Sequence, residues 1–261
     1  MNSKPIGVFD SGLGGLTVVK EIIKALPHED IVYLGDTARV PYGTRSQEVV
    51  TQFAKEDAQF LLKKGVKCIV IACNTASAFA YDYLVKTFNL PIFDVISSAS
   101  EKALELGGNQ IGVIGTRGTI DSKAYNKKLG QKLLTLACPL FVPLIEEGEI
   151  EGAIIKSIVK KYLQYFKGKP LKVLILGCTH YPIIKPEIER YLGSKILYID
   201  PGKEVATKLN EYLSANKLLN SQTGLGKVDY YVTDVNNKFK ETAKMFMGNG
   251  VSKKIRKVDI N

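Results

Sequence analysis

The stretch CIVIACNTAS (residues 68–77) is an apolar run that ends at a cysteine and continues into polar and small residues. The stretch VLILGCTHYP (residues 173–182) has the same form, with Cys178 in the place of Cys73. Short apolar runs of this kind are typical of buried parallel strands, whose carboxyl ends carry the functional loops of open α/β sheets. The two stretches therefore predict two similar strands, each with a thiol at its end.

The two stretches belong to a longer internal repeat. The tripeptide IGV at residues 6–8 recurs at residues 111–113, and Cys73 recurs as Cys178, in both cases 105 residues later. Asp94 matches Asp200 after one inserted residue. Repetition over this length predicts an α/β fold of two similar, pseudo-symmetric domains, with mainly parallel sheets flanked by helices and the active site in the cleft between them.

The elements expected from this pattern alternate along the chain. Strands are predicted at residues 6–10, 31–36, 68–73, 92–96, 111–116, 139–144, 173–178 and 196–200. Helices are predicted at residues 15–25, 46–64, 76–88, 122–134, 149–166 and 205–215. The chain beyond Asp200 has no counterpart in the repeat, so we expect it to return to the first domain. The predicted domains are residues 1–97 with 208–261, and residues 98–207.

Composition restricts the class of protein. The 261 residues are 45% hydrophobic and 24% charged, as in ordinary soluble globular proteins. We find no apolar run long enough for a membrane helix and no signal-peptide pattern, so we expect a cytoplasmic protein. The net charge of +10 comes from lysines spread along the chain, with one cluster, KKIRK, at residues 253–257. That cluster is more typical of a solvated tail, so nucleic-acid binding is not the expected main function.

The four cysteines have different contexts. A single free cysteine at a strand end is usually a packing residue, but two at equivalent positions, each followed by polar residues and a predicted helix start, favour working thiols. Cys68 and Cys138 lack this context and are expected to be structural. Zinc binding by Cys68 and Cys73 is disfavoured because residues five apart on one strand point to opposite faces, and no metal site is expected. A dithiol redox pair is a competing reading, although the chain has no C-x-x-C motif.

Other polar residues gather at predicted strand ends. His180 follows Cys178 by two residues and is a candidate for proton relay, whereas His28 is expected in a surface loop. Asp10 is a candidate either for the site or for capping the next helix. The glycines of DSGLGGLT (residues 10–17) do not complete a dinucleotide fingerprint, and Asp10 would repel a pyrophosphate. A phosphate loop is therefore disfavoured.

Two thiols related by pseudo-symmetry suit one reaction in particular. Inversion of a carbon stereocentre by proton transfer needs a base on one face of the carbon and an acid on the other. One cysteine would start as the thiolate and its partner as the thiol, with exchanged roles in the reverse direction. The pattern thus favours an enzyme that inverts a stereocentre held between the two halves.

Five segments carry a resemblance to a known family. They are GVFDSGLGGLTV (7–18), YLGDTARVPYGTRS (33–46), IACNTASA (71–78), FVPLIEEGEIEG (141–152) and LGCTHYP (176–182). Together they resemble the glutamate racemases of the aspartate/glutamate racemase superfamily. The resemblance implies a cofactor-independent isomerase that interconverts L- and D-glutamate and supplies D-glutamate for bacterial peptidoglycan. It also implies two α/β domains with the active site between them, and a homodimer as the expected assembly.

The resemblance also implies roles for individual residues. Cys73 would act on D-glutamate with assistance from Asp10, and Cys178 would act on L-glutamate with assistance from His180 and Glu146. The residues expected to hold the substrate, besides Asp10 and His180, are Ser11, Pro41, Tyr42, Gly43, Asn74, Thr75, Thr116 and Thr179. Two rival readings remain open, namely a racemase for aspartate or a hydantoin, and a non-catalytic binding protein for acidic amino acids.

Overall fold

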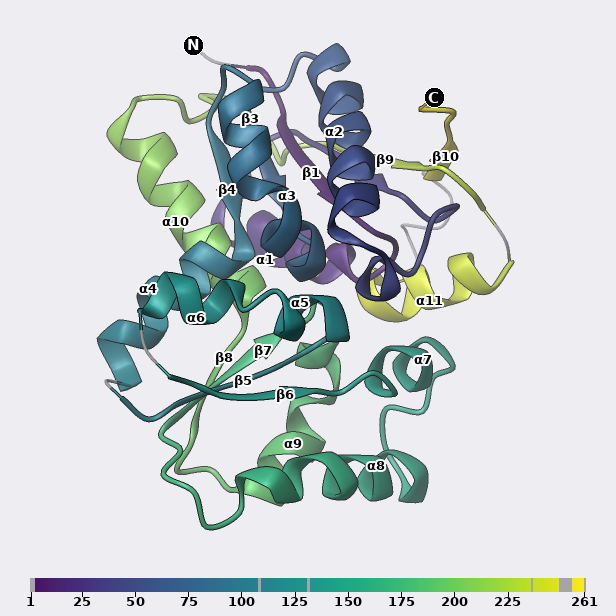
Figure 1. The fold of residues 1–261 in the computed structure, drawn as a ribbon. Coiled ribbons are helices and arrows are strands. Elements are labelled where there is room, and N and C mark those ends of the chain that lie inside the picture. The colour runs from purple at the N-terminus through teal and green to yellow at the C-terminus, as the bar shows by residue number, and fades with distance from the viewer. Residues whose placement is uncertain (1–2, 108, 131, 236, 249–254, 261) are drawn as a thin grey trace.

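Two parallel β-sheets lie one above the other in the computed structural model, each covered by helices (Figure 1). The structure describes residues 3–107, 109–130, 132–235, 237–248 and 255–260. Within these residues every strand pairing is parallel. The α/β class with two parallel sheets and flanking helices, as predicted from the alternating apolar runs, is confirmed.

The described strands form a larger and a smaller sheet. The larger sheet has the order β10-β9-β2-β1-β3-β4, and the smaller has the order β6-β5-β7-β8. The strands of the larger sheet are β1 (Ile6–Asp10), β2 (Ile31–Gly35), β3 (Cys68–Ile71), β4 (Ile92–Asp94), β9 (Val228–Val232) and β10 (Ile255–Lys257). Those of the smaller sheet are β5 (Ile111–Gly115), β6 (Leu134–Ala137), β7 (Val173–Gly177) and β8 (Leu197–Ile199).

The internal repeat of the sequence is visible in the strand register. The order β2-β1-β3-β4 is repeated as β6-β5-β7-β8. Ile6 lies opposite Cys68, and Ile111 lies opposite Val173, so both pairs obey the 105-residue offset. On the next strand Ile69 pairs with Ile92 while Leu174 pairs with Tyr198, which places the one-residue insertion between β7 and β8.

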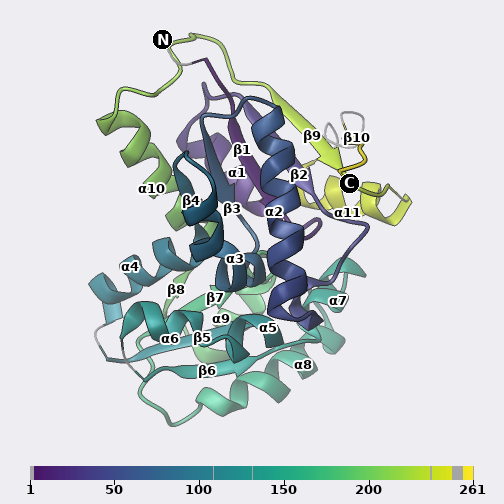
Figure 2. The same ribbon diagram turned by 45° about the horizontal axis from the view of Figure 1, so that its top comes forward.

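Helices cover both faces of each sheet. Figure 2 shows α2 and α3 on one face of the larger sheet, and α1 lies on the other face. Side chains of β3 alternate between the two cores, with Val70 packing on the α1 side and Ile69 on the α2 side, because successive strand residues point to opposite faces. Burial of each such side chain contributes on the order of 1.5–3 kcal/mol.

The helix bounds agree with several sequence predictions to within a few residues. The α-helices are α1 (Gly15–Ala25), α2 (Gln47–Lys63), α3 (Asn74–Thr87), α4 (Val95–Gly107), α5 (Arg117–Asp121), α6 (Ala124–Leu129), α7 (Phe141–Glu146), α8 (Ala153–Leu163), α9 (Lys185–Leu192), α10 (Pro201–Ala215) and α11 (Asn237–Met247). Three short 3₁₀ helices within the described residues are η1 (Tyr42–Thr44), η2 (Gln164–Phe166) and η3 (Tyr181–Ile184).

Two predictions in the middle of the chain are wrong. The strand predicted at residues 139–144 is instead helix α7, and the strand next to β5 is β6, which falls at the end of the helix predicted for residues 122–134. A short apolar run fits a strand and a buried helical turn equally well. The four residues of β6 are all only partly buried, so their pattern is weak.

Two helices lie against elements from the other half of the molecule. α4 follows the larger sheet, but its residues Ile96 and Ala99 pack with Val113 and Ile175 of the smaller sheet. α10 follows the smaller sheet, but it packs against α1, where a Cβ at Gly202 would lie 3.1 Å from Val18 Cγ2. The predicted domain boundaries, after residues 97 and 207, fall inside α4 and α10, and they stay a prediction.

The chain after α10 returns to the larger sheet, where β9 pairs with β2 and β10 pairs with β9. In the KKIRK cluster, residues 253–254 lie outside the described residues. The rest forms β10, and its Arg256 and Lys257 lie 3.7 and 2.9 Å from Asp229 and Asp234. The reading of residues 255–257 as a solvated tail is therefore wrong.

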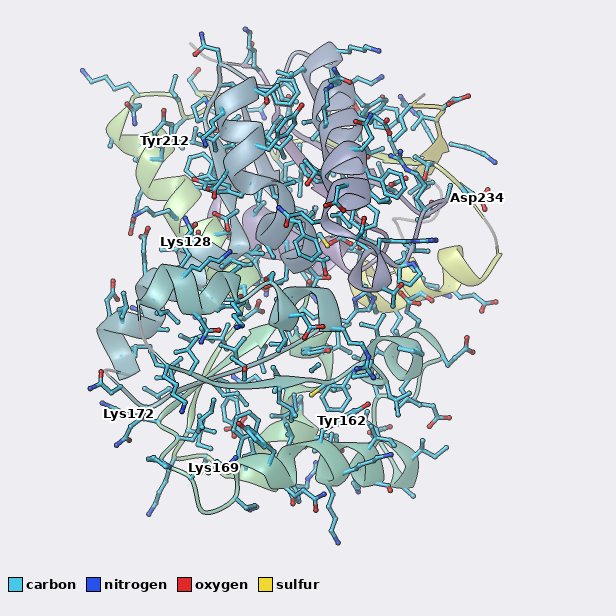
Figure 3. All side chains as sticks on the ribbon, viewed as in Figure 1. Lys128, Tyr162, Lys169, Lys172, Tyr212 and Asp234 are labelled. Carbon is cyan, nitrogen blue, oxygen red and sulfur yellow. The ribbon has the colours of Figure 1, made fainter. Side chains whose placement is uncertain are left out.

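The positive charge is distributed over the surface. In Figure 3, Lys128 lies on α6, whereas Lys169 and Lys172 lie near the loop that precedes β7. Lys128 and Lys169 also sit over the rings of Tyr81 and Tyr165. Among the described helices, none combines the length and the apolar composition that crossing a membrane requires.

Candidate active site

A cavity of about 340 Å³ lies between the two halves of the repeat. Its walls come from loops at the carboxyl ends of strands in both sheets, where open parallel sheets bind ligands. Twelve of the thirteen residues that the sequence singled out line it: Ser11, Pro41, Tyr42, Gly43, Cys73, Asn74, Thr75, Thr116, Glu146, Cys178, Thr179 and His180. The thirteenth, Asp10, is buried beside this wall, where its Oδ2 accepts the backbone N–H of the lining residue Gly12 at 3.0 Å.

Cys73 stands at the junction of β3 and α3. It is the N-cap residue of α3, and its sulfur accepts the backbone N–H of Ala76 at 3.5 Å. The thiol donates to Ser11 Oγ at 3.6 Å. Burial above all, and then the nearby carboxylate of Asp10, raise the pKa of Cys73 to about 12, although the hydrogen bonds with Ala76 and Ser11 lower it. At neutral pH Cys73 is therefore a thiol, which suits a proton donor.

Cys178 has a different setting. It follows β7 but lies three residues before η3, so the helix start predicted directly after it is wrong, and a helix dipole does not act there as it does at Cys73. Instead, its sulfur lies 3.8 Å from Nδ1 of His180. His180 Nε2 lies 2.9 Å from Glu146 Oε1 on α7.

His180 is the charged group of this wall. Burial lowers its pKa, but the hydrogen bonds with Cys178 and Glu146 raise it more strongly, to about 10. At neutral pH the ring is therefore an imidazolium, and each nitrogen donates to one of these two neighbours. An imidazolium at this distance forms an attractive pair with a thiolate, so the geometry favours Cys178 as the base.

Asp10 is held in an environment that opposes its charge. Burial raises the pKa of Asp10, whereas the positive charge of His180 and the backbone N–H groups of Gly15 and Gly12 lower it, with burial dominant. Its Oδ1 has no hydrogen-bond partner among the described residues. The side chain therefore keeps one oxygen available next to the wall that carries Cys73.

The two halves meet through side chains at the cavity wall. Thr75 from the first half lies 2.9 Å from Thr116 Oγ1 of the second half. Thr17 Oγ1 donates to the backbone oxygen of Thr179 at 2.9 Å. These contacts join the loop after each predicted catalytic strand to the opposite half, so the cavity depends on both halves.

The Pro41–Gly43 loop is held from behind by a buried charged cluster, which we call the Asp36 cluster: Asp36, Arg39, Tyr42, Glu56 and Asp57. The Tyr42 hydroxyl oxygen lies 2.5 Å from Asp36 Oδ2 and 3.1 Å from Asp57 Oδ2. Arg39 donates to Asp36 at 2.6 Å and contacts Glu56 and Asp57. The sequence predicted Tyr42 as a binding residue, but it did not predict the hydrogen bonds that hold the Tyr42 hydroxyl or the contacts of Arg39 with the same carboxyl groups.

Several residues of the site carried no local signal in the sequence. Tyr125 on α6 donates to Asn74 Oδ1 at 2.8 Å, although the two residues are 51 positions apart. Arg117, Val142 and Pro143 line the cavity as well. Arg117 directly follows Thr116, which corresponds to Ser11 under the 105-residue offset. That offset was the one signal in the sequence that pointed to this segment.

The remaining cysteines and histidine lie elsewhere. Cys68 and Cys138 are buried in the core that contains Val70 and Leu176. Cys68 lies on the face of the larger sheet opposite to the face on which Cys73 packs. His28 is exposed and contacts the backbone oxygen of Gly224. In the part of the chain that the structure describes, no three His, Cys, Asp or Glu side chains are grouped as metal ligands.

The fold and site thus define an α/β protein in which two cysteines, at equivalent strand ends of the two halves, line one cavity, and comparisons with known proteins give its class. Residues 6–209 match the Asp/Glu/Hydantoin racemase family, to which the chain belongs. The glutamate racemase of Aquifex aeolicus (strain VF5) is 46% identical over 254 residues, which are 96% of each chain. The protein is accordingly an isomerase of the amino-acid racemase class.

Solved structures give the same result. The glutamate racemase from Francisella tularensis subsp. tularensis SCHU S4, in complex with D-glutamate, has a TM-score of 0.93 and 41% identity, covering 100% of this chain and 99% of its own. The Thermus thermophilus glutamate racemase, in complex with beta-chloro-D-alanine, has a TM-score of 0.91 and 41% identity, covering 98% and 97%. The two-domain α/β fold expected from the repeat is shared with these enzymes.

Proposed function

We propose that the protein interconverts L- and D-glutamate by a two-thiol proton transfer at the α-carbon. The observation that carries the proposal is that Cys73 and Cys178, at equivalent strand ends of the two halves, line the same cavity. The choice of glutamate is supported by the similarity to glutamate racemases across the whole chain and by the complex of one of them with D-glutamate.

The unequal settings of the two thiols give the starting state. The Cys178 thiolate, paired with the His180 imidazolium, removes the α-proton from L-glutamate and becomes a thiol. The electron pair of the broken C–H bond stays on the substrate as a carbanion. The Cys73 thiol then gives its proton to the opposite face, which yields D-glutamate and a Cys73 thiolate. The reverse reaction begins from that second state, so each direction uses each thiol once.

The chief difficulty of this reaction is the weak acidity of the α-proton. The carbanion needs hydrogen-bond donors at the substrate carboxylate, where negative charge accumulates in the transition state. Ser11, Asn74 and Thr75 from the first half, together with Thr179 from the second, supply hydroxyl and amide groups at the cavity wall. Asn74, Thr75 and Thr179 are buried, which strengthens these interactions because competing water is excluded.

The decisive experiment follows α-deuterium incorporation from D2O into each glutamate enantiomer, together with loss of optical activity. The wild type is expected to racemise and exchange both enantiomers. Cys73→Ala and Cys178→Ala should each lower racemisation by at least about a thousandfold, because a one-sided site cannot invert the carbon. Near-normal turnover in either variant would overturn the two-thiol assignment.

The same assay separates the rival functions. A racemase for aspartate or a hydantoin would exchange that substrate in preference to glutamate when the compounds are tested side by side. A binding protein would show glutamate affinity without any α-deuterium. We expect glutamate to be the preferred substrate, since the chain is 46% identical to a glutamate racemase over nearly its full length.

The proposed product also indicates a biological role. We infer that the enzyme supplies D-glutamate for peptidoglycan synthesis in the cytoplasm, and that it acts as a homodimer. Depletion of the protein should create a requirement for external D-glutamate and a loss of cell shape. Sedimentation of the purified protein at several concentrations measures the assembly, and a single monomeric species throughout would contradict the dimer.

A further inference from the structure

The oxygen of the Asn74 side chain has a hydrogen-bond partner, whereas its nitrogen has none among the described residues. Asn74 is 3% exposed and lines the cavity. Its Oδ1 accepts the Tyr125 hydroxyl at 2.8 Å, whereas its Nδ2 has no hydrogen-bond partner among the described residues. A buried amide N–H without a partner is unfavourable, so its presence at a cavity wall indicates that a ligand supplies the acceptor.

The Tyr125 ring is fixed by its surroundings. Tyr125 lies on α6 of the second half, is 2% exposed, and packs in the core that contains Ile96, Val113 and Ile175. Burial raises its pKa well above the ordinary value, so the hydroxyl keeps its proton. A buried tyrosine hydroxyl needs an acceptor for that proton, and Asn74 Oδ1 supplies it.

The orientation of the amide follows from this bond. An asparagine amide has an acceptor oxygen on one side and a donor nitrogen on the other, and its hydrogen-bond partners decide which way it faces. With Oδ1 held by Tyr125, the NH₂ group is free to donate elsewhere. Asn74 is the residue directly after Cys73, the proposed acid, and both residues line the cavity.

We propose that Tyr125 is a positioning residue, which holds the Asn74 amide so that its NH₂ group donates to a carboxylate oxygen of the substrate. The proposal rests on the proposed function, because it names the group that receives the hydrogen bond. It adds a residue from the opposite half to the machinery around Cys73. Negative charge accumulates on that carboxylate when the α-proton leaves. The ease of proton removal then depends on the hydrogen bond between Tyr125 of the second half and Asn74 of the first.

A double-mutant cycle tests the coupling. Tyr125→Phe keeps the ring and removes the hydroxyl, and it should lower kcat/KM for both enantiomers by roughly tenfold, the effect of one well-placed hydrogen bond. In the Asn74→Ala background the same change should cost less than about twofold. Equal losses in both backgrounds, or no loss in the first, would overturn the proposal. Tyr198→Phe is the matched control, since its hydroxyl donates to a backbone oxygen, Gly193 O, away from the cavity.

A second variant keeps the test independent of how well Tyr125→Phe folds. Asn74→Asp retains an oxygen that accepts from Tyr125 but has no NH₂ group to donate. It should be impaired as strongly as Asn74→Ala. Wild-type kcat/KM in Asn74→Asp would show that the NH₂ group is not needed, and the proposal would fail.

A readout without turnover separates this proposal from the function itself. The side-chain NH₂ signals of Asn74, identified by their loss in Asn74→Ala, can be followed by ¹⁵N NMR. We expect them to shift on addition of D-glutamate in the wild type, and to exchange faster with solvent in Tyr125→Phe. Unchanged exchange in Tyr125→Phe would contradict the positioning role even in an active enzyme. Absence of α-deuterium in the wild type would instead contradict the proposed function.

Discussion

The two thiols of the cavity are equivalent in the fold but not in their electrostatic surroundings. Cys73 donates to Ser11 near the buried Asp10, whereas Cys178 lies 3.8 Å from the ring of His180. One neighbourhood favours a proton on sulfur, and the other favours a negative charge beside an imidazolium. The proposed reaction needs one acid and one base at its start, and this difference between the two surroundings supports the proposed roles of the two thiols.

The link between His180 and Glu146 predicts a pH effect. The folded pKa of His180, about 10, exceeds the ordinary 6.5, so its ring is charged at neutral pH and loses that charge as the pH rises through 10. The stability that this charge contributes is complete below pH 6.5 and is lost as the pH rises through 10. Turnover of L-glutamate should decline over that upper range. Glu146→Gln removes the carboxylate charge and should move this decline to lower pH by about half a unit to one unit, since the Glu146 side chain is 41% exposed and screened.

The comparison that checks this prediction is the pH dependence of kcat/KM for each enantiomer. Glu147→Gln is the matched control, because Glu147 is the next residue and its side chain is exposed. The shift should be larger for L-glutamate than for D-glutamate. An unshifted alkaline limb in Glu146→Gln would show that Glu146 does not hold the His180 proton.

Asp57 gives a prediction about stability. Burial and the neighbouring Asp36 raise the pKa of Asp57 well above the ordinary 3.8, so the folded protein keeps a proton that the unfolded chain releases. Stability from this group is complete below pH 3.8 and is lost as the pH rises toward the folded pKa. Asp57→Asn mimics the protonated acid but has no proton to lose. The Tm of the variant minus the Tm of the wild type should therefore be about 2–4 °C larger at pH 8 than at pH 4.5. Parallel Tm curves for the two proteins would contradict this.

At the scale of single residues, sequence reasoning found the side chains that adjoin a repeated strand end. Cys178 was found through Cys73, and Thr116 through Ser11, by the common offset. Tyr125 and Asp57 were not found, because their partners, Asn74 and Tyr42, come close only through tertiary packing. A buried hydrogen bond between distant segments leaves no periodicity in the sequence.

At the scale of elements, Cys73 has a second role as the cap of α3. Serine is a strong N-cap and alanine is a poor one. Cys73→Ser and Cys73→Ala should therefore lose racemisation alike, whereas the serine variant should be more stable by about 1 kcal/mol, or roughly 2–4 °C in Tm. Thermal unfolding of both variants measures the difference. Equal Tm values would show that a side-chain cap at residue 73 does not stabilise the helix.

Elements were predictable where burial was complete. β1, β3, β5 and β7 are buried along their whole length and read as continuous apolar runs. The edge strand β6 is only partly buried and was not predicted, whereas α7 is too short to show a helical period and was predicted as a strand. β9 was missed because its second residue, Asp229, is exposed and interrupts the apolar pattern.

At the scale of the whole molecule, Gly14 marks how closely the two halves approach. A Cβ there would lie 2.1 Å from Thr179 Oγ1 and 2.6 Å from the His180 ring. The backbone at Gly14 is helical, with φ −57°, so alanine is acceptable locally. Gly14→Ala should nevertheless cost about 1–3 kcal/mol and lower kcat/KM at least about tenfold, because it displaces His180.

The matched control for Gly14→Ala is Gly224→Ala, where a Cβ meets no atom within 4 Å. Thermal unfolding and kcat/KM of the two variants should differ clearly. If Gly14→Ala kept wild-type activity, the contact between the halves would be loose enough to adjust without moving His180.

The exchange of helices between the halves has a consequence for synthesis of the chain. Each cavity-lining residue named above lies at or before His180, whereas α10, which covers α1, begins at Pro201. A chain growing on the ribosome therefore presents a full set of cavity residues before the helix that buries Val18 and Ile22 has emerged. All of these cavity residues are therefore synthesised before α10 can pack on α1, and we expect the cavity to reach its final form only after the last 61 residues have emerged.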